Sequence, residues 1–178
     1  MPESSTNVVI AGADENDEFT LLDLLRTPER ILAWTRLLLK TLAVHRTLAL
    51  AQDAGVKVAE LGHRVRELLS LLKNSKYTRI HTVMLAEYLP DRETERLMND
   101  LDDLQLSSRS LFVNRVLFPE DIRQCRRCHH ARAWQLATLA KLRRRYRAVN
   151  IYVIRNFPNE IEGKNALRSF TGELWRIQ

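Results

Sequence analysis

One helical face carries a long apolar stripe in the first half of the chain, and this periodicity constrains the fold more than any other feature. The stripe consists of residues at spacings of three and four, namely Ile31, Trp34, Leu38, Leu42, His45 and Ala49. Thr27-Pro28-Glu29 has the composition of a helix start, because threonine can cap, proline suits the first turn and an acid complements the helix dipole. We therefore predict a deeply packed helix that begins near Thr27 and ends at Gly55.

The same spacing predicts helices along the rest of the chain. Their apolar faces lie at Val58–Leu72, Tyr77–Leu89, Leu97–Leu104, Leu111–Val116 and Leu167–Ile177. Phe118-Pro119-Glu120-Asp121 is a further helix start, from which a helix of roughly 28 residues can run. Val149–Ile154 is the only strand-like run in the sequence, and it is too isolated to imply a sheet. The predicted fold class is therefore all-α, with two helical halves in an oligomeric helical assembly.

Charge and polar punctuation divide the sequence into segments. Residues 1–18 contain several acids and no lysine or arginine, as a solvated leader would. Ser107-Ser108 follows the last helix of the acidic part, and the sign of the charge changes there. We therefore predict an acidic mobile leader at 1–18, an N-terminal helical domain at 19–106 and a C-terminal basic helical domain at 107–178.

Basic residues concentrate in one segment, from Arg109 to Arg155. This segment holds 12 of the 28 lysines and arginines but only 2 of the 22 acids, so its net charge is +10 in a chain of net charge +6. Such a cluster repels itself unless a polyanion neutralises it, and arginine can bind phosphate oxygens in pairs. We therefore predict a nucleic acid as the partner, with a binding site made of Arg123, Arg126, Arg127, Arg132, Lys141, Arg143, Arg144, Arg145 and Arg147. A long arginine-rich helix suits binding to a phosphate backbone by shape, which favours RNA.

Two other functional classes stay open at this point. One is a DNA-binding regulator with a helix-turn-helix, although the nearest segment, Leu106-Ser-Ser-Arg-Ser, lacks a glycine turn. The other is a helical protein-interaction adaptor whose basic face binds acidic proteins. The charge pattern does not decide between RNA and DNA, or between single and double strands, because every nucleic acid offers phosphates.

Cys125-Arg-Arg-Cys128-His129 is the one motif with metal-ligand spacing. It matches the pattern of c-type haem attachment, which we reject because the chain has no signal peptide and no methionine follows the motif. Structural zinc sites usually bring two ligand pairs from different segments, and no second pair occurs. We expect two small buried thiols beside a histidine and no metal site, while metal binding by Cys125, Cys128 and His129 stays an open alternative.

The sequence offers no sign of catalysis or of membrane insertion. It contains no Ser/His/Asp or Cys/His arrangement, phosphate loop or dinucleotide fingerprint. We therefore predict no catalytic residue, no enzyme activity, no cofactor and no small-molecule substrate. No apolar run approaches the roughly 20 residues that span a bilayer, and the N-terminus lacks a signal sequence. The expected location is the cytoplasm, with no membrane partner.

Thr27–Trp34 opens the first half of the chain, and the arginine-rich segment Arg123–Arg147 dominates the second. With these segments and a mass near 21 kDa, the chain resembles the RNA-silencing suppressors of closteroviruses. The resemblance implies a helical homo-oligomer that assembles into a ring and sequesters small or duplex RNA without base specificity. It also implies a viral protein of the host cytoplasm that suppresses RNA silencing, with no cofactor and no enzyme activity.

Overall fold

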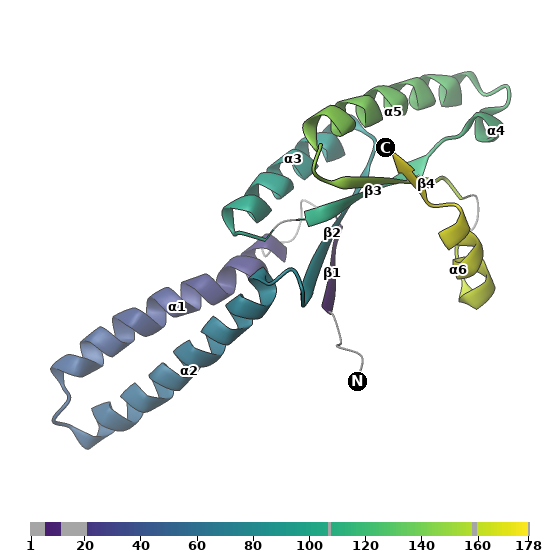
Figure 1. The fold of residues 1–178 in the computed structure, drawn as a ribbon. Helices are drawn as coiled ribbons and strands as arrows, with labels where there is room; N and C mark the ends of the chain where they lie inside the picture. Colours follow the sequence, from purple (N-terminus) through teal and green to yellow (C-terminus); the bar gives the residue numbers. More distant parts are fainter. Residues whose placement is uncertain (1–5, 12–20, 107, 158–159, 178) are drawn as a thin grey trace. The chain divides into compact units, whose positions relative to one another are not determined.

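The computed structural model of the chain describes residues 6–11, 21–106, 108–157 and 160–177. These residues form two compact units. One unit contains two long helices, and the other contains a β-sheet with the remaining helices (Figure 1). The helical unit is built mainly from sequence neighbours, whereas the sheet joins segments that lie far apart in the chain.

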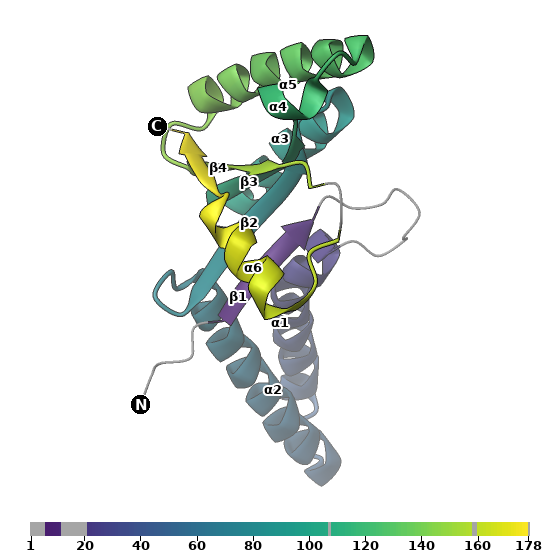
Figure 2. The same ribbon diagram turned by 90° about the vertical axis from the view of Figure 1, so that its right-hand side faces the viewer.

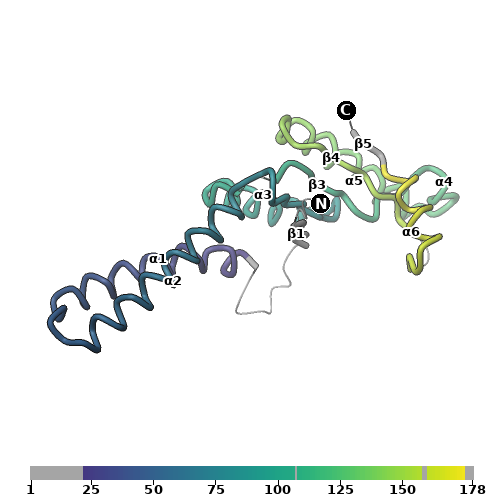
Figure 3. Tube along the Cα trace, turned by 60° about the horizontal axis from the view of Figure 1, so that its bottom comes forward, coloured from purple at the N-terminus to yellow at the C-terminus, as the bar shows by residue number. Residues whose placement is uncertain are grey.

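The helical unit is an antiparallel hairpin of α1 (Leu21–Val44) and α2 (Ala49–Lys73), which lie side by side (Figures 1 and 3). Leu32 and Val65 are buried in this unit. Gly62 permits a close approach of the helices, because a Cβ atom built on it would lie only 3.4 Å from Thr35 Oγ1. Few residues of the hairpin are fully buried, so its core is thin.

The first helix differs from its predicted limits at both ends. α1 begins at Leu21, contains Pro28, and ends at Val44 rather than at Gly55. Thr27 Oγ1 donates a hydrogen bond to the Asp23 carbonyl 2.7 Å away, so this threonine bonds back within the helix and does not cap it. Gly55 lies inside α2, where a single glycine is tolerated.

The second unit is built on a five-stranded sheet with the order β1-β2-β3-β4-β5. β2, β3 and β4 run parallel, and β5 pairs antiparallel with β4. The strands lie next to one another in the order of the sequence (Figure 2). Their bounds are Thr6–Ala11 (β1), Thr78–Leu85 (β2), Ser108–Val116 (β3), Asn150–Arg155 (β4) and Trp175–Ile177 (β5).

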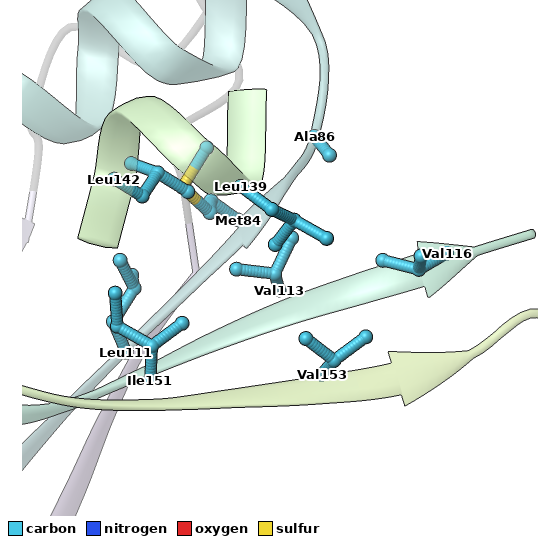
Figure 4. Packing of buried hydrophobic residues seen from close by; sticks show 9 residues of the cluster. All are labelled: Met84, Ala86, Leu111, Val113, Val116, Leu139, Leu142, Ile151 and Val153. Atoms are coloured by element: carbon cyan, nitrogen blue, oxygen red, sulfur yellow. The ribbon is translucent and has the colours of Figure 1, made fainter. Parts of the chain in front are cut away.

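Helical crossovers cover one face of the three parallel strands. They are α3 (Tyr88–Asp103) between β2 and β3, and α4 (Pro119–Ile122) with α5 (Arg126–Arg145) between β3 and β4. Leu139 and Leu142 of α5 pack on the strands in a buried cluster with Met84, Ala86, Leu111, Val113, Val116, Ile151 and Val153 (Figure 4). α6 (Gly163–Gly172) connects β4 to β5. Parallel strands joined by helices make this unit α/β.

The other face of the strands carries a row of aromatic rings. Phe112 stacks on Tyr152, with ring centroids 5.0 Å apart, and His81 meets Phe112 edge-on at 5.8 Å. His81 Nδ1 is also hydrogen-bonded to Ser110 Oγ. These three rings are half-buried, whereas Leu111 on the helix-covered face is fully buried.

The predicted all-α fold class is wrong, because the chain contains a parallel sheet. β2 occupies most of a segment predicted as a helix at Tyr77–Leu89, and β3 contains the helix predicted at Leu111–Val116. Buried parallel strands read as near-continuous apolar runs, which short windows do not distinguish from buried helices. Val149–Ile154 looked isolated because its partner strand, β3, lies about 40 residues earlier in the chain.

The long basic helix and the last helix are also shorter than predicted. α4 ends at Ile122 and α5 begins at Arg126, because the intervening Arg123 has a positive φ of 39° that a right-handed helix does not allow. The segment predicted as one helix at Leu167–Ile177 contains the end of α6 followed by strand β5.

The predicted segments at 1–18, 19–106 and 107–178 stay a prediction. Of the acidic leader, only Thr6–Ala11 belongs to the described residues, where it forms β1. The rest of the leader lies outside the described residues, and so does Ser107 at the predicted boundary.

Candidate functional site

The carboxyl ends of β2, β3 and β4 meet at one edge of the sheet, because the three strands run parallel. The arrowheads of β3 and β4 point to this edge in Figure 4. In open α/β sheets, ligands bind in the crevice beyond the carboxyl ends of the strands. This carboxyl edge is therefore our candidate functional site.

A bulge in β3 shapes the centre of the carboxyl edge. The pairing of β3 with β4 shifts register between Val113 and Val116, and Arg115 has a φ of 56°. Residues other than glycine seldom adopt positive φ, and such strain clusters at binding sites. Asn114 is half-buried, and its Oδ1 accepts a hydrogen bond from Arg115 N at 2.8 Å. Its amide nitrogen makes no hydrogen bond with the part of the chain that the structure describes.

Gln135 of α5 holds the backbone behind this bulge. Its Oε1 accepts a hydrogen bond from Leu117 N at 2.9 Å, and its Nε2 donates to the Arg115 carbonyl at 3.0 Å. Asn156 N donates to the Val116 carbonyl at 2.9 Å, which joins the end of β3 to the residue after β4. The backbone from Arg115 to Leu117 is therefore fixed by hydrogen bonds from two different segments.

An ion pair closes the same edge. Arg155, the last residue of β4, donates to both carboxylate oxygens of Asp121, and the shortest distance is 2.6 Å between Nη2 and Oδ1. Phe118 N also donates to Asp121 Oδ2, at 2.8 Å. Burial of Asp121 opposes its ionisation, but the hydrogen bonds from Arg155 and from Phe118 N outweigh it and hold the pKa of Asp121 below its usual value.

Most residues of the predicted RNA-binding site lie on α5, where Arg126, Arg127, Lys141, Arg143 and Arg144 are exposed. Arg132 is half-buried on the same helix, while Arg123 precedes α5 and Arg147 follows it. Arg145 Nη1, in contrast, lies 3.0 Å from Asp91 Oδ1 and 3.6 Å from Glu95 Oε2 of α3. Acids that are distant in sequence thus neutralise part of the basic helix. A binding role for the nine residues stays a prediction.

Cys125 and Cys128 form a disulfide at the start of α5. Cys125 caps the helix, because its sulfur accepts a hydrogen bond from Cys128 N at 3.2 Å. Cys125 is exposed and Cys128 half-buried, so the expectation of two buried thiols is wrong. His129 Nε2 lies 3.1 Å from the Arg123 carbonyl oxygen. Within the described ranges, no three or more His, Cys, Asp and Glu side chains gather where they could hold a metal ion.

The α1–α2 hairpin exposes many large apolar side chains. Trp34 is 64% exposed and Leu50 is 81% exposed. The other exposed apolar residues of the hairpin are Leu24, Leu37, Leu38, Val44, Leu48, Val56, Leu61, Leu68 and Leu71. Exposed apolar patches mark places where another protein or a membrane binds. Among the helices that the structure describes, none has the length and hydropathy needed to cross a membrane.

Comparison with known proteins identifies relatives of the chain. A family model described as anion-transporting ATPase matches residues 20–176. The chain is 29% identical over 118 residues to the ATPase get3 of Aspergillus terreus and 28% identical over 118 residues to the ATPase get3 of Aspergillus niger. Each of these alignments covers 66% of this chain and 35% of the relative. The chain thus spans about a third of the length of the curated relatives that it matches.

These matches overturn the function predicted from charge. The resemblance to closterovirus RNA-silencing suppressors is wrong, because the matching family and the named relatives are ATPases. RNA as the main partner and the two alternatives, a DNA-binding regulator and an adaptor, are wrong for the same reason. The expectations of no enzyme activity and no small-molecule substrate are also wrong, since an ATPase family acts on a nucleotide.

Neither the charge pattern nor any motif in the sequence predicts the polar residues at the carboxyl edge. Asn114 and Gln135 are single polar residues that belong to no recognised spacing, and Asp121 stands out in the sequence only as an acid of a helix start. A usable signal is the position of Asn114 directly after the apolar run Leu111–Val113, because a polar residue at the carboxyl end of a strand is typical of sites in α/β folds.

The fold and the comparisons agree with each other. Parallel strands with helical crossovers form the architecture in which nucleotides bind at the carboxyl edge of the sheet. The family model covers well over half of the sequence, from residue 20 to residue 176. The chain therefore belongs to the anion-transporting ATPase family.

Proposed function

We propose that the chain is part of an ATP-binding ATPase and that the nucleotide base binds at the carboxyl edge of β2, β3 and β4. The observation that carries this proposal is the half-buried Asn114 on a strained bulge at the centre of that edge. An asparagine amide offers a donor beside an acceptor, and this pair matches the amino group and a ring nitrogen of adenine. Membership of an ATPase family supports ATP as the nucleotide.

The groups that bind phosphate and activate water are not assigned to these residues. The sequence contains no glycine-rich phosphate loop of the G-x-x-x-x-G-K-[ST] type. The matched segment is also only about a third of the length of the relatives. We therefore assign base recognition to the carboxyl edge and propose ATP hydrolysis as the activity of the whole ATPase.

The test of base recognition is a fluorescence titration with ribose-labelled nucleotides, mant-ATP and mant-GTP. Asn114→Ala removes two hydrogen bonds to adenine, so we expect its affinity for mant-ATP to fall about tenfold and its preference over mant-GTP to disappear. Asn99→Ala on α3 is the matched control, because Asn99 is an exposed asparagine away from the edge. Absence of mant-ATP binding to the wild type at millimolar concentration would sink the proposal.

A second function is favoured by the α1–α2 hairpin. We propose that its exposed apolar side chains bind an apolar helical segment of a client protein. Trp34, Leu38 and Leu61 are among the large groups that water contacts in the free chain. Covering each of them with apolar surface contributes roughly 1–2 kcal/mol, and an apolar helix laid on a helical surface covers several at once.

We also propose the cytoplasm as the location of this activity. ATP and apolar segments of other proteins, the two proposed ligands, are both present there. Cell fractionation with immunoblotting tests the location. Recovery of the chain only in membrane pellets that resist a high-salt wash would contradict it.

A further inference from the structure

Gln135 is a buried amide on a helix that otherwise packs apolar groups on the sheet. It is 9% exposed, while Leu139 and Leu142 of the same helix belong to the apolar core. Among the residues that the structure describes, Gln135 is the one buried side-chain amide. Burying an amide is unfavourable unless both its donor and its acceptor find partners.

Both ends of this amide bind the main chain at the bulge in β3. Leu117 N donates to Oε1 at 2.9 Å, and Nε2 donates to the Arg115 carbonyl at 3.0 Å. The two backbone groups flank Val116, where the register between β3 and β4 shifts. The side chain of Gln135 therefore supplies the hydrogen bonds that a regular neighbouring strand would supply, and it holds Arg115 in its positive-φ conformation.

We propose that Gln135 is a positioning residue for recognition of the adenine base, which rests on the proposed function of the carboxyl edge. Gln135 does not reach the ligand. It fixes the backbone from Arg115 to Leu117, and this backbone sets the direction of the adjacent Asn114 amide. An amide selects adenine over guanine only when its donor and acceptor are held in register with the base edge, because guanine presents the O6 acceptor where adenine presents its amino donor.

A purely structural role would not select glutamine at this position. A regular strand needs no side chain to bond its backbone, and an apolar residue on α5 would extend the core. The chain instead combines a strained Arg115 with a buried amide that holds it. The strained backbone and the buried amide are each unfavourable when taken alone. Their combination is typical of a binding site, where local stability is given up for function.

The experiment compares Gln135→Leu and Gln135→Glu in the full chain, with Gln124→Leu and Gln124→Glu as matched controls. Gln124 is an exposed glutamine just before α5. The readouts are dissociation constants for mant-ATP and mant-GTP and the hydrogen exchange of the Leu117 and Phe118 amides. We expect Gln135→Leu to speed exchange at Leu117, to weaken mant-ATP binding about tenfold and to leave mant-GTP within about twofold.

Gln135→Glu adds a pH readout that a merely structural residue would not give. The ionised carboxylate accepts from Leu117 N but repels the Arg115 carbonyl, whereas the protonated form donates to that carbonyl as glutamine does. Burial raises the pKa of a carboxyl above its ordinary value of about 4.3, so the preference for mant-ATP should be lost near pH 8 and return as the pH falls toward that raised pKa, while the ratio for the wild type stays level. This variant also decides the question if Gln135→Leu does not fold.

The possible outcomes separate the two proposals. If the wild type binds neither nucleotide, the proposed function fails and the role of Gln135 fails with it. If the wild type prefers mant-ATP and the Gln135 variants keep that preference, base recognition stands and the positioning role is overturned. Equal loss of affinity for both nucleotides would also overturn it, since this result indicates general damage to the edge.

Discussion

Arg155 and Asp121 form a two-pronged ion pair that ties the last residue of β4 to α4. Arg155 Nη2 and Asp121 Oδ1 are 2.6 Å apart, and Phe118 N binds the second carboxylate oxygen at 2.8 Å. One carboxylate therefore joins two of the three segments that leave the carboxyl edge. The spacing between these segments depends on a charge and not only on apolar packing.

Replacing this carboxylate should destabilise the second unit. Asp121→Asn keeps the size of the side chain but removes the charge that Arg155 binds, so we expect the midpoint of thermal unfolding to fall by about 2–6 °C. Circular dichroism during heating measures this change. Glu120→Gln is the control, because Glu120 is more exposed and lies 3.3 Å from Arg155. An equal effect of both substitutions would contradict a special role for Asp121.

The same pair should make stability depend on pH. The pKa of Asp121 is lowered from its ordinary value of 3.8 in the folded protein. Its carboxylate therefore stabilises the fold above that value, and this contribution disappears as the pH falls through the lower folded-state pKa. Urea titrations should show a constant difference between the wild type and Asp121→Asn from about pH 8 to pH 6 and a smaller one below about pH 4. A difference that grows on acidification would contradict this sign.

Two glycines of α2 should respond oppositely to a larger side chain. Nothing lies within 4 Å of a Cβ built on Gly55, so Gly55→Ala should stabilise the chain by about 0.5–1 kcal/mol through helix propensity alone. Gly62 faces Thr35, and Gly62→Leu should force the two helices apart and destabilise the chain by about 1–3 kcal/mol. Urea unfolding measures both. Stabilisation by Gly62→Leu would refute the close helix contact.

The cap of α5 gives a prediction in which serine and alanine differ. The disulfide joins residues only three apart, so its loss restricts the unfolded chain little. Serine is a good N-cap and alanine a poor one, so Cys125→Ala should be about 1 kcal/mol less stable than Cys125→Ser. At Cys128, which caps nothing, the two substitutions should be equal. Urea unfolding of the four variants under reducing conditions provides the measurement.

Trp34 can report on the proposed client surface. Its side chain is exposed in the hairpin, so burial under an apolar helical peptide should shift the tryptophan emission to shorter wavelength. Trp34→Phe should remove most of this shift while keeping peptide binding within about twofold, since phenylalanine still offers an apolar ring. Leu38→Gln with Leu61→Gln should weaken binding about tenfold or more. Unchanged binding by the double variant would contradict a client role for the hairpin.

Helical periodicity predicts the parts of the fold whose packing is local. Trp34 and Leu38 of the predicted stripe do lie in a helix, α1, but their side chains are exposed, so the expected deep packing of this face is wrong. The helix predicted with its apolar face at Leu97–Leu104 corresponds to α3. Sheet segments are harder to predict because their polar residues find partners far away. Ser108 reads as punctuation in the sequence, yet it is buried in β3, accepts from Thr82 Oγ1 at 3.1 Å and donates to the Ile80 carbonyl.

The candidate site was also hard to predict from the sequence, because its residues come together only in the folded sheet. Asn114 and Gln135 are 21 positions apart, and only the crossover through α4 and α5 brings Gln135 to the bulge beside Asn114. The charge pattern predicted Arg145 as a binding residue, but its guanidinium forms an ion pair with Asp91 of α3. Such pairings depend on the assembled sheet, so neither hydropathy nor local charge could have indicated them.

The register of the parallel strands implies an order of events when the chain folds. Ile80 pairs with Ser108 and Ser110 with Asn150, so closing these contacts brings together residues 28 and 40 positions apart. α1 and α2 are joined by only a short connection from residue 45 to residue 48. Chain closure over long separations slows folding. The hairpin should therefore form first, and a nascent chain would present its leucines before the carboxyl edge could bind any nucleotide.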